Sequence, residues 1–372
     1  MNKKIVHIII GLNVGGAELM LKRLVLHSQE TGQFQHSVIS LTDTGAIGLD
    51  LQDQGIEVYS LGMTSLTSIP RIFLGLKKLL KKIRPDVVQT WMYHADFLGG
   101  LAARSVGIKN IIWGIRTTDV SQGASKQTVH LSKLCAKLSY YIPTTIVCAA
   151  HVSKDYHVGM GYDKSKMIVI PNGFDIEALS STNEDGLNVR KQVSLYASDT
   201  VIGSVGRFNP VKNQKLFVDV AATLLKDFPD LKFMLVGRDN TTENQELMSW
   251  IKKHNIADSF RLLGQRSDVS KCLKAMDIFC LHSKTEGFPN VVGEAILADT
   301  PCVAVNVGDV AVLLDEESIA SSNDVAGISS AIKNYLKYPK DKLKEKTDKN
   351  REDVINKYAM EVVLNKFHAL YN

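Results

Sequence analysis

The sequence has no hydrophobic segment long enough to cross a membrane. Its N-terminal apolar run, Ile5–Ile10, is far shorter than the roughly 18 to 20 residues that span a bilayer, and it leads directly into a glycine loop. Such a run is typical of a first β-strand rather than of a signal peptide. We therefore predict a cytoplasmic protein without a transmembrane helix.

Cysteine and metal-binding patterns are also scarce. The cysteines are odd in number, scattered and without a C-x-x-C pair, which predicts reduced core thiols rather than disulfides or metal ligands. The histidines form no H-E-x-x-H pattern, and no D-x-D triplet is present to hold a divalent ion against a diphosphate. We expect a metal-independent protein without a cofactor. The five cysteines are Cys135, Cys148, Cys272, Cys280 and Cys302.

Positive charge is concentrated in the first half. Residues 1–180 hold 19 Lys+Arg against 13 Asp+Glu. Few aromatic residues are interleaved with this charge, which argues against nucleic-acid binding. Within 71–84, an apolar helical stripe is flanked by Lys77, Lys78, Lys81 and Lys82. This helix can pack on the core with a solvated basic face, it can lie against an anionic membrane, or both can hold at once.

Short apolar runs alternate with helical periodicity along the whole chain, which predicts βαβ units and an α/β fold. A length of 372 residues with 45% hydrophobic content is enough for two domains. We place the first at 1–170 and the second at 171–354. The amphipathic segment 353–371 predicts a closing helix, and 355–372 would pack back on the first domain. Predicted strands are 4–10, 36–41, 57–60, 87–90, 110–114 and 145–149, then 201–205, 232–236, 260–263, 278–281 and 302–305.

A breaker-rich loop between two glutamates is the strongest site candidate. Glu286 and Glu294 flank a Gly-Phe-Pro-Asn sequence that follows a predicted buried strand. With Asn290 as N-cap, the amides of 291–293 would point toward an anion, while the carboxylates would accept sugar and ribose hydroxyls. The spacing alone is commonly coincidental, but the intervening sequence argues for a sugar-nucleotide site.

Two further loops follow predicted strands. Arg207 and Lys212 lie five apart at the carboxyl end of a strand, where α/β folds bind ligands, and together can neutralise a diphosphate. Solvated loop cations are the alternative. Gly15 and Gly16 follow the first strand and let backbone amides approach a phosphate, although a tight structural turn explains them equally well. Their pattern is neither G-x-G-x-x-G nor a P-loop.

In order and spacing these motifs resemble those of glycosyltransferase family 4, retaining enzymes of the GT-B fold, over nearly the whole chain. The resemblance is carried by Gly15–Glu18, Pro171–Gly173, Gly206–Arg207 with Lys212, Leu235–Gly237, Leu263–Gly264 and Glu286–Glu294. It implies two Rossmann-like domains facing one another.

The resemblance also implies roles for individual residues. Arg207 and Lys212 would bind the donor diphosphate, Glu286 the donor sugar and Glu294 the ribose. Gly16 would approach the diphosphate from the first domain. Additional donor contacts would come from Gly264 and Gln265 near the base, and from Gly287, Phe288, Pro289, Asn290, Val291 and Val292.

The chain departs from the family at one position. Arg116 stands where many members have a histidine near the donor sugar, and it could instead hold an anionic sugar or the acceptor's pyrophosphate. His94 follows another predicted strand on the acceptor side. It is either an acceptor contact or a local structural hydrogen-bonding residue.

The predicted function is retaining transfer of a hexose from a nucleotide sugar, more readily UDP than GDP, to a lipid-linked oligosaccharide in bacterial O-antigen or capsule assembly. The protein would act peripherally on the inner face of the cell membrane. Two alternatives remain open from the sequence, a GT-B epimerase that acts on a UDP-sugar and a non-catalytic binding or scaffold protein.

Overall fold

The computed structural model describes residues 2–120 and 125–372, and the chain divides into two compact units. Unit 1 comprises Met1–Gly173 and Met360–Asn372, and unit 2 comprises Phe174–Ala359. The first domain was predicted to end at residue 170, and unit 1 instead continues to Gly173 before the chain enters unit 2. The returning segment begins at Met360, against a predicted start at 355.

Unit 1 is built on a parallel sheet with strand order β3-β2-β1-β4-β5-β6-β7. Its strands other than the edge strands β3 and β7 are buried along most of their length, as expected of a sheet covered on both faces. The very short strand β7 was not predicted. The strands are β1 (Lys3–Ile9), β2 (Phe34–Ser40), β3 (Glu57–Ser60), β4 (Val87–Trp91), β5 (Asn110–Ile115), β6 (Thr145–Cys148) and β7 (Met167–Val169).

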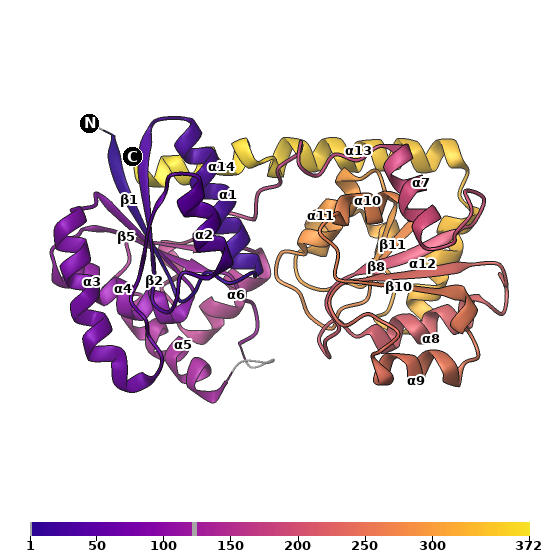
Figure 1. Cartoon of the computed structure of the whole chain (residues 1–372), viewed down its shortest axis with the longest axis horizontal. Coiled ribbons are helices and arrows are strands. Elements are labelled where there is room, and N and C mark those ends of the chain that lie inside the picture. Colours follow the sequence, from indigo (N-terminus) through magenta and orange to yellow (C-terminus); the bar gives the residue numbers. More distant parts are fainter. Residues whose placement is uncertain (1, 121–124) are drawn as a thin grey trace. The chain divides into compact units, whose positions relative to one another are not determined.

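Helices cover both faces of this sheet (Figure 1). One hydrophobic cluster joins α1 (Gly16–Glu30), α2 (Gly45–Asp53) and α14 (Met360–Tyr371) to the sheet. The other contains α3 (Ile69–Ile83), α4 (Tyr93–Ser105) and α5 (Lys126–Leu138). The remaining elements are α6 (His151–Met160) and the 3₁₀ turns η1 (Leu66–Ser68) and η2 (Lys164–Lys166).

Helix α3 has the predicted two-sided character. Ile72, Leu76 and Leu80 are buried in the core cluster, while Lys78, Lys81 and Lys82 are exposed. Lys77 is half-buried, with its ammonium 5.6 Å from the ring centroid of Phe73. The apolar stripe therefore packs inward and leaves the basic face outward.

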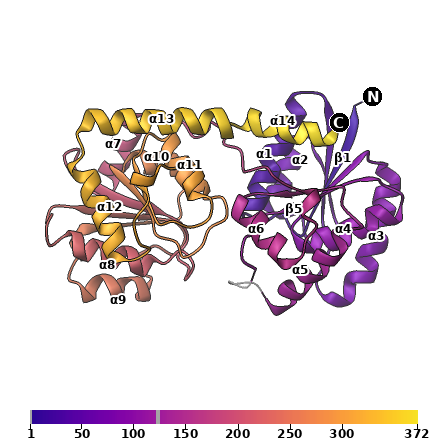
Figure 2. The ribbon, with the colours of Figure 1, turned by 180° about the vertical axis from the view of Figure 1, so that it is seen from behind.

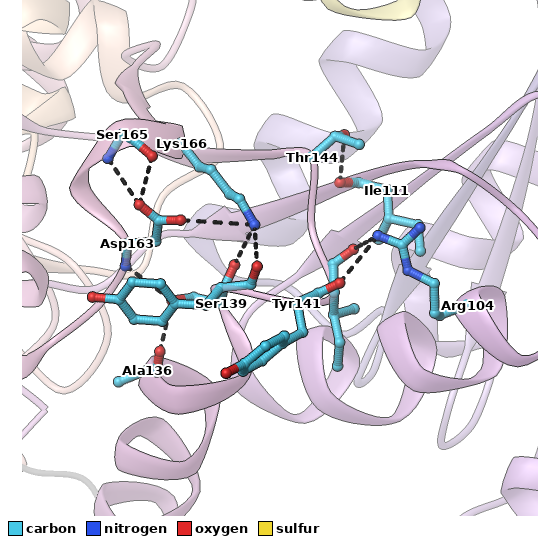
Figure 3. A network of polar contacts seen from close by, with 11 residues as sticks. Arg104, Ile111, Ala136, Ser139, Tyr141, Thr144, Asp163, Ser165 and Lys166 are labelled. Atoms are coloured by element: carbon cyan, nitrogen blue, oxygen red, sulfur yellow. Dashed lines mark hydrogen bonds and ion pairs between the residues drawn. The ribbon is translucent and has the colours of Figure 1, made fainter.

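The loop after α5 is held by a network of polar contacts. The Lys166 ammonium donates to the carbonyl oxygens of Ser139 and Tyr140 at 2.9 and 2.7 Å, and the Asp163 amide donates to the Ser139 hydroxyl at 2.9 Å. Arg104 donates to the carbonyl of Tyr141 at 3.2 Å (Figure 3). These bonds fix the C-terminal end of α5.

A directional chain of hydrogen bonds runs through the core of unit 1. The Trp91 indole, which can only donate, donates to Nδ1 of His7 at 3.2 Å. Nε2 of His7 must then carry the proton and donate to His36 Nδ1 at 3.0 Å, and His36 donates to Ser28 at 2.7 Å. Ser28 in turn donates to His368 at 2.8 Å, which ties α14 to β1, β2 and α1.

Unit 2 contains a parallel sheet with strand order β10-β9-β8-β11-β12. Strands β8, β9 and β11 have the predicted bounds. The strands are β8 (Val201–Val205), β9 (Lys232–Val236), β10 (Phe260–Gly264), β11 (Ile278–Leu281) and β12 (Cys302–Ala304).

One face of this sheet packs on α8 (Gln214–Leu224), α9 (Gln245–Lys253) and α12 (Val325–Lys337). Helices α7 (Asn183–Gln192), α10 (Val269–Lys274), α11 (Asn290–Leu297) and α13 (Lys340–Tyr358) contact one another in series (Figure 2). The 3₁₀ turns are η3 (Ala257–Ser259), η4 (Val310–Val312) and η5 (Glu316–Ser318).

The single closing helix predicted over 353–371 is wrong, because the chain breaks at Ala359 between α13 and α14. Ala359 is extended, with φ −55° and ψ 147°. It pairs with Phe174 in an isolated parallel bridge, and the Phe174 amide donates to the Tyr358 carbonyl at 2.8 Å. This long-range pairing leaves no trace in the amphipathic pattern of the segment.

Candidate functional site

The loop after β8 is held rigidly by its own polar side chains. Asn209 accepts the Val211 amide through its side chain at 3.0 Å and the Lys212 amide through its carbonyl at 2.9 Å. Gln214 donates to the Arg207 carbonyl at 2.8 Å. The backbone on both sides of Lys212 is thereby fixed, and the Arg207 side chain is left exposed.

The carboxyl ends of β8, β9 and β10 approach one another closely through glycines. Gly237 has φ +132°, and a Cβ there would lie 2.4 Å from the Gly206 carbonyl oxygen. The Gly237 amide donates to the Gly264 carbonyl at 2.7 Å. The buried Asn240 side chain donates to the Gly206 carbonyl at 2.7 Å. Asn240 was not singled out in the sequence, because its role depends on contacts between strands.

The predicted site residues Lys212 and Glu286 form an ion pair. Nζ of Lys212 lies 2.6 Å from Oε1 of Glu286, and the exposed fractions of the two side chains are 29% and 12%. The loops that carry them are also joined by the Lys284 amide, which donates to the Val211 carbonyl at 2.8 Å. These loops leave β8 and β11, which are neighbours where the strand order reverses. Parallel α/β sheets bind ligands at such a switch point.

The backbone under Glu286 is packed against a third loop. Gly308 has φ +58°, and a Cβ there would lie 2.4 Å from the Gly287 carbonyl oxygen and 2.7 Å from that of Glu286. The Asp309 amide donates to the Gly287 carbonyl at 2.9 Å. The glycine at 308 is therefore required for Glu286 to hold its position.

The N-terminus of α11 differs from the prediction. Pro289, not Asn290, is the capping position, and no side chain accepts a hydrogen bond there. The Val292 amide is not free, since it donates to the Pro289 carbonyl at 3.0 Å. Phe288 is only 7% exposed, and its ring packs 5.2 Å from Tyr358 and 6.0 Å from Phe174. Any ligand contact of Phe288 must therefore come from its backbone.

The other predicted donor residues are distributed around this edge of the sheet. Gly264 ends β10 in the left-handed region with φ +62°, and Gln265 beyond it is exposed. Glu294 is half-buried in α11, and Val291 is half-buried in the first turn of that helix.

His282, which follows β11, was also missed. It is 3% exposed, and its ring lies 5.1 Å from the ring of Phe217. Among residues 2–120 and 125–372 neither ring nitrogen has a partner at hydrogen-bond distance, although backbone groups of Lys212 and Asn213 lie close. Burial lowers the pKa of His282 to about 4, so a neutral imidazole lies beneath the Lys212 loop.

In unit 1, the predicted phosphate loop holds a carboxylate of its own. Gly16 begins α1 and has open space where a side chain would project. At Gly15, however, a Cβ would lie 2.4 Å from Oε2 of Glu18. The Glu18 carboxylate therefore folds over the helix N-terminus, where negative charge is favourable. Burial raises the pKa of Glu18.

Arg116 follows β5 and is a buried cation with incomplete hydrogen bonding. Nη1 donates to Oδ1 of Asn172 at 3.1 Å, and the guanidinium lies 4.6 Å from the ring centroid of Trp91. Nε and Nη2 are buried without a hydrogen-bond partner in the part of the chain that the structure describes. Burial lowers the pKa of Arg116 to about 10, so the group is cationic at neutral pH.

His94 lies just after β4, beside strained backbone. Met92 has φ +70° and ψ 160°, a backbone conformation that residues other than glycine rarely adopt. Such strained conformations often mark functional sites. Burial lowers the pKa of His94. Asp96, on the same turn, is fully buried with its pKa raised to about 8 by burial, and its Oδ1 accepts from Thr90 at 2.5 Å.

Comparison with known proteins decides the family. One family model, "Glycosyltransferase Family 4", matches residues 14–178, and another, "Glycosyl transferases group 1", matches residues 187–354. The chain belongs to these glycosyltransferases. It is an enzyme of the transferase class, and the two models divide it between residues 178 and 187.

Similar sequences include bacterial glycosyltransferases. The chain is 28% identical over 311 residues to the UDP-Gal:alpha-D-GlcNAc-diphosphoundecaprenol alpha-1,3-galactosyltransferase of Escherichia coli, covering 82% of this glycosyltransferase and 80% of that protein. It is 25% identical over 294 residues to the capsular polysaccharide biosynthesis glycosyltransferase CapH of Staphylococcus aureus, covering 78% of each chain.

Solved structures confirm the GT-B fold. Anabaena HepE in complex with UDP matches with a TM-score of 0.86 at 19% identity, over 98% of each chain. A Rickettsia africae glycosyltransferase matches with a TM-score of 0.83 at 17% identity, over 100% of this chain and 98% of the other.

Within residues 2–120 and 125–372, no helix is long and apolar enough to cross a membrane. The same residues contain no group of three or more side chains suited to hold a metal ion. All five cysteines are buried and free.

Proposed function

We propose that this glycosyltransferase moves a hexose, with retention of anomeric configuration, from a UDP-sugar to a lipid-linked oligosaccharide in bacterial O-antigen or capsule biosynthesis. It would act in the cytoplasm, peripherally on the inner face of the membrane. The observation that carries the proposal is the Lys212–Glu286 ion pair at the switch point of the unit 2 sheet, with Arg207 on the same loop.

The ion pair suggests how donor binding prepares the site. A donor diphosphate carries more negative charge than one carboxylate, so it competes for the Lys212 ammonium, with Arg207 as a second cation. The Glu286 carboxylate is then available to accept hydroxyls of the sugar. Glu294 would accept the ribose hydroxyls, and Gly264 and Gln265 would lie near the base.

The chemistry requires stabilisation of the leaving nucleotide diphosphate. Arg207 and Lys212 would supply fixed positive charge as the bond to the anomeric carbon breaks, a type of contribution that typically accounts for several kcal/mol. Double displacement would need a second carboxylate beside the anomeric carbon. The proposal is instead front-face attack, in which an oxygen of the leaving phosphate takes the proton of the acceptor hydroxyl.

Unit 1 would bind the acceptor. Arg116 has two buried N–H-bearing nitrogens without a hydrogen-bond partner in the described residues, which makes an anionic group of the acceptor or donor a favourable partner. His94 would contact the acceptor. The names of the relatives support this assignment, since the Escherichia coli protein is described as acting on a diphosphoundecaprenol-linked sugar.

The basic face of α3 would bind the membrane. Lys78, Lys81 and Lys82 are exposed and Lys77 is half-buried, and each cation near an anionic surface adds about 1 kcal/mol. Partition onto vesicles with and without anionic lipid, at low and high salt, tests this part separately. Binding that does not depend on anionic lipid would contradict it.

Thermal shift with UDP, GDP and ADP tests the donor assignment. We expect the largest stabilisation with UDP, and no stabilisation by any of the three would contradict the proposal. A panel of UDP- and GDP-sugars then identifies the donor, with and without a lipid-linked acceptor. Conversion of the donor without acceptor would indicate an epimerase instead. NMR of the anomeric centre of the product determines retention or inversion.

A further inference from the structure

Unit 1 contains an apolar pocket that the proposed donor chemistry does not use. Its volume is about 510 Å³, within the range of small-molecule sites. Segments far apart in the sequence supply its walls, from η1, α3, α4 and α5. The apolar side chains that these helices contribute to the lining are Leu66, Ile69, Phe97, Leu98, Leu131 and Leu134.

The pocket lies at the carboxyl edge of the unit 1 sheet. Ile10 comes directly after β1 and Thr42 two residues after β2, while Met63 and His94 lie three residues after β3 and β4, respectively; all four line the pocket. This is the edge at which parallel α/β sheets bind ligands. The proposed acceptor contact His94 is thus part of the wall of a predominantly apolar cavity.

The mouth of the pocket exposes apolar surface. Leu66 is 61% exposed and Leu134 is 42% exposed. Large exposed apolar side chains at the rim of an apolar cavity indicate a ligand with a hydrocarbon part. The rim on α5 is fixed in place, because the polar network around Ser139 and Lys166 holds the end of that helix (Figure 3).

The charged residues of α3 and α5 that lie next to the pocket in the chain are cations. Arg71 is two residues after Ile69 and donates to the Gly62 carbonyl, beside Met63, at 3.0 Å, and Lys126 precedes Gln127 in the first turn of α5. Neither helix contains an Asp or Glu, whereas Lys81 at the other end of α3 lies with Arg84 and Asp86 at the amino edge of the sheet. An uncharged hydrocarbon gains nothing from this field, whereas a hydrocarbon attached to a phosphate or diphosphate does. The chemistry around the pocket is therefore that of an anionic amphiphile.

We propose that this pocket takes the part of the hydrocarbon chain nearest the diphosphate of the lipid-linked acceptor. The inference rests on the proposed function and deepens it, because it assigns a binding site to the lipid itself rather than to the sugar. The chain would enter past Leu66 and Leu134, and the diphosphate would remain in the positive field near the rim.

Two soluble probes with the same head group test the pocket on the full chain. Farnesyl diphosphate has fifteen carbons in its chain and isopentenyl diphosphate has five, so a chain-binding pocket distinguishes them by calorimetry. We expect farnesyl diphosphate to bind at least about thirtyfold more tightly, because the additional methylene and methyl groups leave water. Equal affinities would overturn the proposal.

Matched substitutions separate the pocket from a general apolar surface. Leu66→Glu and Leu134→Glu each place a charge at the mouth, and both sites are exposed, so folding is preserved. We expect each to weaken farnesyl diphosphate binding about tenfold or more. Leu74→Glu is the control, since Leu74 is 65% exposed on the same basic helix α3 but does not line the pocket. We expect the Leu74→Glu variant to bind farnesyl diphosphate as tightly as the unchanged protein does.

The possible outcomes distinguish this inference from the proposed function. If Leu74→Glu weakens binding as much as Leu134→Glu, the lipid meets a surface patch and the pocket assignment is wrong. If farnesyl diphosphate fails to bind while UDP still stabilises the protein, the lipid pocket fails and the donor assignment stands. Concentration-dependent dimerisation that Leu134→Glu abolishes, without lipid binding, would assign the pocket to a second copy of the chain and overturn the proposal.

Discussion

The two units share a parallel-sheet topology but differ in the chemistry at the carboxyl edges of their sheets. In unit 2 the edge consists of close-packed glycine backbone and a partly exposed pair of opposite charges, Lys212 and Glu286. In unit 1 it consists of an apolar pocket and a buried cation, Arg116, that lacks full hydrogen bonding among the described residues. The first suits a polar, anionic ligand, and the second suits an amphiphile.

If both proposals hold, one architecture accommodates two unlike ligands. The βαβ repeat fixes only that loops gather at one edge of each sheet. The side chains of those loops determine what each edge binds. Substitutions at one edge should therefore change one ligand's binding and leave the other's unchanged.

Removing the cation of the unit 2 pair should have the largest effect. We expect Lys212→Ala to lower kcat about 10²- to 10³-fold, as is typical when a group that stabilises developing charge is lost. The control is Lys215→Ala, because Lys215 pairs with Asp219 at 2.6 Å on α8, outside the proposed site. Affinity for a lipid diphosphate, measured on the same variant, should not change. If Lys212→Ala is fully active, the proposed role of the ion pair is wrong.

The backbone contact under Glu286 offers a second test. In Gly308→Ala the new methyl group meets two carbonyl oxygens at a backbone angle that favours glycine. We expect a loss of about 2 to 4 kcal/mol in the stability of unit 2, as for other strained positions with a steric clash. Gly55→Ala in unit 1 is the control for positive φ, read from the stability of that unit, because its φ is +80° and nothing lies within 4 Å of its Cβ position. Urea unfolding of both variants separates the clash from the positive φ alone.

The histidine chain of unit 1 predicts a dependence of stability on pH. Burial lowers the pKa of His36 to about 4, and burial together with the neighbouring His36 lowers the pKa of His7 well below its ordinary value. The unfolded chain therefore takes up protons below pH 6.5 while the folded chain does not, so stability is full above that pH and falls toward pH 4. For His36 alone we expect a loss of about 2 kcal/mol at pH 5.

Unfolding in urea at pH 7 and pH 5 measures this effect. Trp91 and Trp113 report on unit 1 by fluorescence, and Trp250 reports on unit 2. We expect the pH-dependent loss to diminish in His36→Gln, which cannot titrate. If the free energy of unfolding of that variant falls as much between pH 7 and pH 5 as in the unchanged protein, His36 does not control the acid sensitivity of unit 1.

The smallest expected effect is the change in stability when Arg116 is replaced. Because two of its nitrogens are buried without partners in the described residues, replacement by a long apolar side chain should not destabilise the fold. We expect Arg116→Met to leave the melting temperature unchanged or slightly raised, while transfer falls about tenfold through loss of an anion contact. A clear fall in the melting temperature with normal transfer would identify Arg116 as purely structural.

Much of the fold could be predicted from sequence because parallel strands buried on both faces are continuous apolar runs. The bounds of β8, β9 and β11 follow directly from such runs, whereas β7, an edge strand directly before the Pro171–Gly173 turn, was not recognised. The break at Ala359 could not be predicted, since the amphipathic pattern continues through it and the cause is pairing with Phe174.

The residues of the candidate site could be selected from the sequence, but their geometry could not. Lys212 and Glu286 were each selected from their own loops, yet their pairing depends on β8 and β11 being neighbours in the sheet. The cap at Asn290 was wrong because helix α11 begins one residue earlier than the side-chain preference indicates. The surroundings of Arg116, with Trp91 beneath it and Asn172 beside it, combine segments more than 20 residues away in the chain on each side.

The pairing of Phe174 with Ala359 has a consequence for engineering the chain. The two points at which the polypeptide passes between units are adjacent, because Phe174 donates to the Tyr358 carbonyl and a Cβ on Gly173 would lie 3.2 Å from Cα of Met360. Unit 2 is thus an insert whose two ends meet, an arrangement that tolerates excision and circular permutation. We expect residues 174–359 to fold when expressed alone, and a short linker from 173 to 360 to close the remainder.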